Sequence, residues 1–487
     1  MRVKLQSHWG RLVVCLFLLG LGLALFLHKS TDNVMHPALD RLAAIPLSER
    51  WSHPEMLKIR NLGKEAIPAL RAVLREKDRA TTRLLLWVRA SWPAAANYYA
   101  RLPDPAQLSD RRWVACQALQ TLGSTGKPAA PELVDILKGA DLRDVNSATM
   151  ALYAIGIDSD ICDRLAALLE QEKSIPDGAR SQIVGALGQV PSSSARTLQV
   201  LVASLGDPYP YVQYHAADAL GRLQVRTPEI VSKLSVLQSS ANEETVVIAA
   251  SAALWELEKD PSLVLPRVLT VLKALVVKPV VPFPGGGNGG QAIESADQAF
   301  MAAGALFQRL GLASEEKSQA LALLEAWAEK SDRIFIRMLL LPAMMQLGFP
   351  TEKCMEVCTT GLNASEDYYR LQAAKLLALA CEKHPLSKVD LDQLLKSPEV
   401  GLRVYGAKVH WLKNRQAQTA VPILVEALDR SKHQSYSYAE VQPVAIQTLR
   451  DMGPAAQAAI GALESLSTDP NREVVAKAAE AISQIRR

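Results

Sequence analysis

The sequence predicts an all-α protein, a right-handed α-solenoid of about twelve antiparallel helix pairs preceded by one transmembrane helix. Three observations predict the solenoid. A motif recurs at a nearly fixed spacing, its apolar residues follow the period of one helix face, and glycine or proline separates each helix from the next. Because a single short helix pair is marginally stable, we expect the pairs to stack and share one continuous core.

The repeat unit is clearest between Trp113 and Leu137. Its first half places apolar residues three and four positions apart, as on one face of a helix. Gly123 ends this helix by supplying the left-handed conformation that often follows a helix. Pro128 suits the first turn of a second helix, because its missing N–H would be unpaired there anyway. The unit is therefore two short antiparallel helices.

Each copy of the unit can be aligned on one apolar residue. The aligned residues are Leu119, Leu152, Leu187, Leu220, Leu254, Phe307, Met344, Leu376, Val409, Leu449 and Ile482, with an earlier copy on Ile59. From Leu119 onward the spacings are 33, 35, 33, 34, 53, 37, 32, 33, 40 and 33 residues. Six of these ten spacings lie between 32 and 34, so chance periodicity is a poor explanation. Alanines precede several of the aligned residues, which would let neighbouring helices approach closely.

Three segments carry a more specific pattern of an acidic-Pro turn, a valine, an alanine-rich run and Leu-Gly. Residues 206–223 read GDPYPYVQYHAADALGRL, residues 468–485 read TDPNREVVAKAAEAISQI, and residues 397–412 follow more loosely. These segments resemble the HEAT-repeat family, and their short period is similar to that of the bacterial repeats first recognised in phycobilin lyases. The resemblance covers roughly residues 54–487. It implies an armadillo-type solenoid that builds a binding surface more often than an enzyme site.

The N-terminal region predicts attachment to a membrane. Residues 12–28 form a mostly apolar run without Asp, Glu, Lys or Arg, and three basic residues precede it. Such a run approaches the length needed to cross a hydrocarbon core of ~30 Å. Because basic flanks stay on the cytoplasmic side, we expect residues 1–11 inside. The protein would be a single-pass protein of the cytoplasmic membrane, with its solenoid outside in the periplasm or extracellular space.

Two alternatives to this anchor exist. Cleavage of the segment as a signal peptide would give a secreted protein, although no A-x-A site follows the apolar run. Lipidation of Cys15 would require a small residue before it, where Val14 stands. We favour the uncleaved anchor, followed by a linker over residues 29–53 that contains one short helix, and then the solenoid over residues 54–487.

Three segments interrupt the repeat, near residues 79–110, 276–292 and 431–442. Aromatic residues occur in all three, and aromatic side chains concentrate binding energy at protein interfaces. The candidate partner-binding residues are Trp87, Trp92, Tyr98, Tyr99, Phe283, Tyr436 and Tyr438. For the first segment, the alternative is that its aromatics cap the open end of the core. For the second, the alternative is a passive loop, since its glycines lack the Lys-Ser/Thr of a phosphate-binding loop.

Cysteines offer the one candidate metal site. Cys354 and Cys358 are four residues apart, on one face of a predicted helix, and Cys381 of the next repeat could join them. No suitably placed histidine completes the set, so these cysteines are more typical of small buried side chains. His215 sits in an alanine-rich segment and is interpreted as a packing or hydrogen-bonding residue. We identify no catalytic residue and expect no cofactor.

Charge and composition favour protein as the partner. Residues 1–100 hold 15 Lys and Arg against 7 Asp and Glu, whereas the remainder carries a net charge of −4. The repeats therefore lack the basic ridge that nucleic-acid binding requires, and we expect no small-molecule substrate. The sequence predicts a membrane-tethered interaction scaffold, with docking along second helices and inserted loops. The alternatives are an enzyme in the groove, which could be metal-dependent, and a spacing element without a dedicated partner.

Overall fold

The computed structural model describes residues 36–46, 50, 53–76, 105–139, 142–172, 175–190, 194–278, 295–331, 333–383, 391–429, 437–469 and 472–487. Regular structure in these ranges is entirely helical, and no strand occurs among them. The predicted all-α class is therefore confirmed. The chain divides into two compact units, residues 1–156 (unit 1) and residues 157–487 (unit 2).

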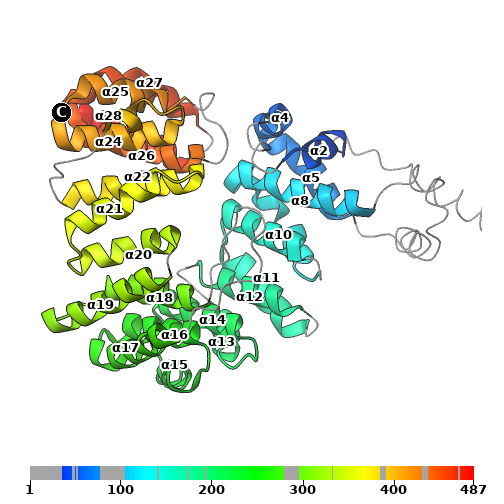
Figure 1. The fold of residues 1–487 in the computed structure, drawn as a ribbon. Helices are drawn as coiled ribbons and strands as arrows, with labels where there is room; N and C mark the ends of the chain where they lie inside the picture. The colour runs from blue at the N-terminus through cyan, green and yellow to red at the C-terminus, as the bar shows by residue number, and fades with distance from the viewer. Residues whose placement is uncertain are drawn as a thin grey trace, which may run out of the picture. The chain divides into compact units, whose positions relative to one another are not determined.

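Unit 1 is organised around one long helix. Its described helices are α2 (His36–Ala43), α4 (Pro54–Leu62), η1 (Gly63–Ala66), α5 (Ile67–Leu74), α8 (Pro105–Leu122), η3 (Gly123–Ala129), α9 (Ala130–Ile136) and α10 (Leu142–Ile155). Helix α8 packs against α2, α4, α5 and α10 (Figure 1). The short helix expected within the linker is α2, and it packs on α8. Residues 105–110 of the first predicted insertion belong to α8 itself.

The predicted repeat unit of unit 1 is confirmed, with one difference. Gly123 has a φ of +54°, the left-handed conformation expected at the end of the first helix. Pro128 does not begin an α-helix, because it lies inside the 3-10 helix η3, and α9 starts at Ala130. The tighter 3-10 turn brings Gly126 close to Ile155, where an added Cβ would lie 2.9 Å from the Cγ2 atom.

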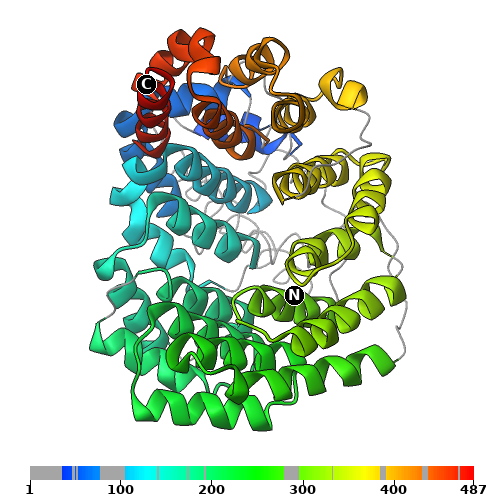
Figure 2. The same ribbon diagram turned by 90° about the vertical axis from the view of Figure 1, so that its left-hand side faces the viewer.

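Unit 2 consists of two layers of helices, seen as antiparallel pairs stacked in sequence in Figure 2. The first-helix layer comprises α12 (Asp177–Leu187), α14 (Pro210–Leu223), α16 (Glu244–Glu258), α18 (Ser295–Phe307), α20 (Ile334–Gln346), α22 (Asp367–Lys383), α24 (Val400–Asn414), α26 (Ser437–Met452) and α28 (Arg472–Ile485). The second-helix layer comprises α11 (Ser159–Gln171), α13 (Ala195–Ser204), α15 (Pro228–Ser240), α17 (Pro261–Val277), α19 (Ser314–Lys330), α21 (Thr351–Leu362), α23 (Leu391–Leu395), α25 (Ala417–Glu426), η5 (Gly453–Ala459), α27 (Ile460–Glu464) and η6 (Ser465–Thr468).

Small residues join the first-helix layer, as the alanine-rich pattern predicts. Every consecutive pair from α12 to α28 packs directly. A Cβ added to Gly188 would lie 2.6 Å from the Cβ of Ala219, and one added to Gly221 would lie 2.9 Å from the Cα of Ala253. Side chains larger than hydrogen at these two positions would push the helices apart.

The aligned apolar residues form the core. Leu119, Leu152, Leu187 and Leu220 are fully buried, and most of the others are nearly so. Ile482 of α28 is the exception, because it is only partly buried at the edge of the core formed by α24 to α28. The repeat register read from the sequence is therefore correct.

Arginines connect neighbouring repeats along the stack. In three repeats, the guanidinium of a first helix donates both to a backbone carbonyl of the preceding segment and to a carboxylate of the next repeat. The pairs are Arg112–Asp144 (3.0 Å), Arg180–Asp207 (3.0 Å) and Arg370–Glu399 (2.8 Å). The side chains are partly buried, so these contacts stabilise more than exposed ion pairs do.

The prediction of a membrane location is contradicted and is corrected here. None of the helices in the described ranges is long and apolar enough to cross a membrane. Helix α8, at 18 residues, carries Asp110, Arg111 and Arg112 in its middle, charges that a hydrocarbon core would not accommodate. The segment predicted as the anchor, residues 12–28, lies outside the described residues.

Candidate protein-binding surface

The aromatic residues selected from the insertions lie outside the described part of the chain. This holds for Trp87, Trp92, Tyr98, Tyr99, Phe283 and Tyr436, and for the side chain of Tyr438 in α26. The structure therefore does not test whether these residues lie close together. Their role in partner binding stays a prediction.

The three candidate metal ligands lie in or next to the core. Cys354 and Cys358 of α21 are buried, and Cys381 of α22 is partly buried. Burial raises the pKa of the Cys354 and Cys381 thiols to about 11 and that of Cys358 to about 12. They are protonated at neutral pH, so a metal ion that bound them would have to displace these protons. In the ranges that are described, no group of three or more His, Cys, Asp or Glu is arranged to hold a metal ion.

Aromatic rings gather instead at the start of α14. Pro210 occupies the first turn of this helix, and the Asp207 carboxylate accepts the backbone N–H of Tyr209 at 2.9 Å, which fixes the preceding turn. The ring centroids of Tyr209 and Tyr211 are 5.6 Å apart. The Tyr214 ring meets His215 edge to face at 5.1 Å. Such offset and edge contacts hold the rings in defined positions.

A shallow cavity of about 440 Å³ lies beside these rings. It is lined by Tyr211, Tyr214 and His215 of α14 and by Gln298, Met301 and Ala302 of α18. Both helices pack against α16, which separates them. Tyr211 remains 42% exposed. We call these six residues the α14–α18 surface.

The α14–α18 surface is uncharged at neutral pH. Burial lowers the pKa of His215, and burial likewise raises the pKa of the Tyr214 hydroxyl. His215 packs against Gly185 of α12, where an added Cβ would lie 3.2 Å from the imidazole Nδ1. The packing role interpreted for this histidine from the sequence agrees with this contact. Asp218 and Arg222, whose charges act on both Tyr214 and His215, pair with each other at 2.7 Å.

A second aromatic cluster lies farther along the same layer. Phe335, at the start of α20, contacts Tyr368 and Tyr369, at the start of α22, with ring centroids 6.2 and 5.5 Å away. Tyr368 is 42% exposed. Both clusters therefore occupy the N-terminal ends of first helices.

The partner-binding residues predicted from the sequence all lie in the insertions and do not include these rings. A signal for them exists in the helix phase of α14. Val212, Ala216 and Leu220 mark its buried face, so Tyr211 and Tyr214 fall on another face. An aromatic residue that lies off the apolar stripe of a repeat is not needed for the core, and this indicates a contact surface.

Comparisons with known proteins identify no family for this chain and give no function. No protein-family model matches the sequence, and no curated protein matches it. The condensin Cnd3–Cnd2 subcomplex of S. pombe aligns with 92% of this chain and 76% of its own at 13% identity, with a TM-score of 0.36. A model of the full-length AP-3 complex in an intermediate open conformation aligns with 76% of this chain and 71% of its own, at 13% identity and a TM-score of 0.33.

The karyopherin Kap121p, bound to the extreme C-terminus of the phosphatase Cdc14p, aligns with 94% of this chain at 14% identity and a TM-score of 0.33. This chain covers 51% of the karyopherin, about half its length. At such low TM-scores the likeness carries no argument about function, and the solenoid assignment rests on the stacked helix pairs themselves.

Proposed function

We propose that this protein is a protein-binding scaffold and that the α14–α18 surface is one of its docking sites. The observation that carries this proposal is the uncharged cavity of about 440 Å³ beside the exposed ring of Tyr211. Aromatic rings at exposed, well-supported positions supply a large contact area at a low cost in conformational entropy. The tyrosine hydroxyls add hydrogen bonds at the edge of such a contact.

The support beneath the surface suits this role. Tyr214 and His215 hold each other edge to face, and Gly185 of the neighbouring repeat admits the imidazole. A surface built on packed helices loses little freedom when a partner binds, and this improves affinity. The competing idea of a metal-dependent enzyme gains no support from the described residues, where no group of three or more His, Cys, Asp or Glu is arranged to hold a metal ion.

Site-specific photocrosslinking in cells tests the proposal. A photoreactive amino acid replaces Tyr211 in one variant and Leu263 in the control, because Leu263 is an exposed apolar residue of α17 in the other layer. We expect a discrete protein adduct from position 211 and none of the same mass from position 263. Adding Met301→Arg should abolish that adduct, since Met301 lines the same cavity. No adduct at position 211, or one that survives M301R, would refute this docking site.

A further inference from the structure

A separate groove opens in the second-helix layer, between α19 and α21. Helix α19 packs directly against α17, but in the described chain it has no comparable packing with α21. Helix α20 of the first-helix layer forms the floor between them, and the groove encloses a cavity of about 190 Å³. This volume is below the ~300 Å³ at which small-molecule sites usually begin, and it suits one large apolar side chain.

Apart from Arg337 of α20, the floor of the groove is apolar. Leu341 and Met344 of α20 are buried there, and Phe349, in the turn before α21, is nearly buried. Ile334 and Val357 complete it at half-buried positions. A side chain entering the cavity would therefore leave water for a hydrocarbon environment, which is the main source of binding energy at such sites.

The rim of the groove is acidic. The Lys353 ammonium of α21 reaches across to Glu325 of α19 at 2.9 Å. Glu329 on α19 and Glu356 on α21 line the opposite walls with exposed carboxylates, and neither has an ion-pair partner among the described residues. The hydrogen bond and charge of Glu325, together with the charges of Glu329 and Glu356, raise the pKa of Lys353. The lining therefore holds three carboxylates against two cations, Lys353 and Arg337, and it keeps a net negative charge. The Arg337 guanidinium also donates to the Ala328 carbonyl at 3.1 Å.

We propose that the groove between α19 and α21 binds a basic amphipathic helix of a partner protein. One apolar side chain of that helix fills the cavity, and its lysine or arginine residues pair with Glu329 and Glu356. An extended strand would gain no backbone partners here, because the N–H and C=O groups along helix walls are already bonded within the helices. A helix satisfies its own backbone and presents apolar residues at the spacing that such grooves accept. This site does not depend on the α14–α18 surface, which lies in the other layer.

Fluorescence anisotropy with the full-length protein and synthetic peptides tests this site. The probe is a labelled peptide with leucine on one helix face and lysine on the other, and the control peptide carries glutamate in place of lysine. We expect the lysine peptide alone to bind, and its binding to weaken as salt is added. Equal binding of the two peptides would overturn the proposal.

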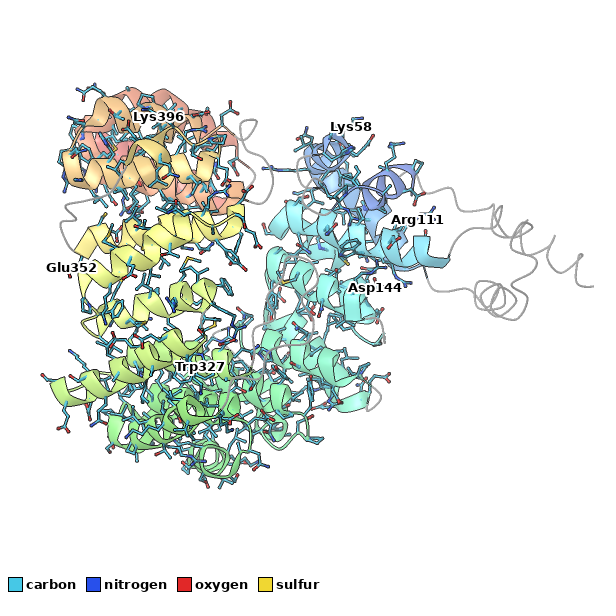
Figure 3. All side chains as sticks on the ribbon, in the orientation of Figure 1. Lys58, Arg111, Asp144, Trp327, Glu352 and Lys396 are labelled. Atoms are coloured by element: carbon cyan, nitrogen blue, oxygen red, sulfur yellow. The ribbon has the colours of Figure 1, made fainter. Side chains whose placement is uncertain are left out.

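Matched variants locate the binding. Glu329→Lys combined with Glu356→Lys reverses both rim charges and should weaken binding of the lysine peptide by about tenfold. The control variant combines Glu315→Lys with Glu352→Lys, exposed positions on the same two helices that do not line the cavity (Glu352 is labelled in Figure 3). It changes the net charge equally and should weaken binding less than about twofold. Equal losses in the two variants would show binding to general negative charge and would overturn the groove.

Discussion

The two helix layers of unit 2 pack differently. In the first-helix layer, glycine and alanine bring each helix into direct contact with the next. In the second-helix layer, α11 packs directly against α13, and α17 packs against α19. Within the described residues, α13 and α15 pack together less extensively, and so do α19 and α21. Figure 1 shows α14, α16 and α18 on the inner side of the bend in unit 2, with α15, α17 and α19 outside.

This difference explains where each kind of surface lies. Consecutive first helices pack directly on one another, and side chains such as Tyr211 project from this layer. Spread second helices leave grooves. One is the α19–α21 groove, and another, of about 430 Å³, lies between α13 and α15 beside Val236. The small residues of the first-helix layer thus favour projecting side chains as contacts in that layer and grooves in the second-helix layer.

The largest expected effect comes from breaking the link between the layers. Asp297 of α18 is fully buried, and it accepts the indole N–H of Trp327 in α19 at 3.0 Å and pairs with Arg333. Trp327 is labelled in Figure 3. Asp297→Ala should destabilise the protein by about 3–5 kcal/mol, because it leaves a partly buried guanidinium without this carboxylate. Urea unfolding followed by tryptophan fluorescence measures this. Glu229→Ala, at an exposed pair, should change stability by less than about 0.5 kcal/mol; similar losses in both would contradict the role of Asp297.

Truncating the core tests the repeat register. Leu220 is fully buried in α14, so Leu220→Ala should cost about 2–5 kcal/mol through lost burial and the cavity that remains. The same unfolding experiment applies. A neutral result would mean that α14 does not present this face to the core.

The close approach within the first-helix layer can be tested at a glycine. Gly188→Ala places a Cβ against Ala219 and should cost about 1–3 kcal/mol. Gly206→Ala is the matched control, because the nearest atom to its added Cβ is 3.6 Å away. Thermal unfolding should separate the two variants. Equal stability of the two variants would contradict the claim that close packing at Gly188 holds neighbouring first helices together.

The smallest effect is a pH dependence centred on His215. Burial lowers its pKa in the folded protein below the ordinary value of 6.5. The unfolded chain then binds the proton more readily, so stability is lost as pH falls below about 6.5, by at most about 1.4 kcal/mol per pH unit. Unfolding experiments between pH 7.5 and 5 compare the wild type with His215→Gln, which should lose this part of the dependence. An unchanged profile in the variant would assign the effect to other groups.

The sequence predicted the helix pairs and their register well, because both follow from local signals. The left-handed Gly123 and the buried Leu220 are examples of such signals. The sequence did not predict the α14–α18 surface, because its cavity is lined by two helices, α14 and α18, that are not consecutive in the layer and have α16 between them. The spread of α19 and α21 likewise depends on packing across several repeats. Pro128 was assigned to an α-helix because sequence spacing does not distinguish a first α-helical turn from a 3-10 turn.

The most direct test of the scaffold function is quantitative affinity purification of the full-length protein from cells. The wild type is compared with a variant that combines Tyr211→Ala and Met301→Ala, and with Leu263→Ala as a control in the other layer. We expect one partner protein to be recovered with the wild type and the control, and about tenfold less with the double variant. Equal recovery with all three, while the double variant remains folded, would contradict docking at the α14–α18 surface.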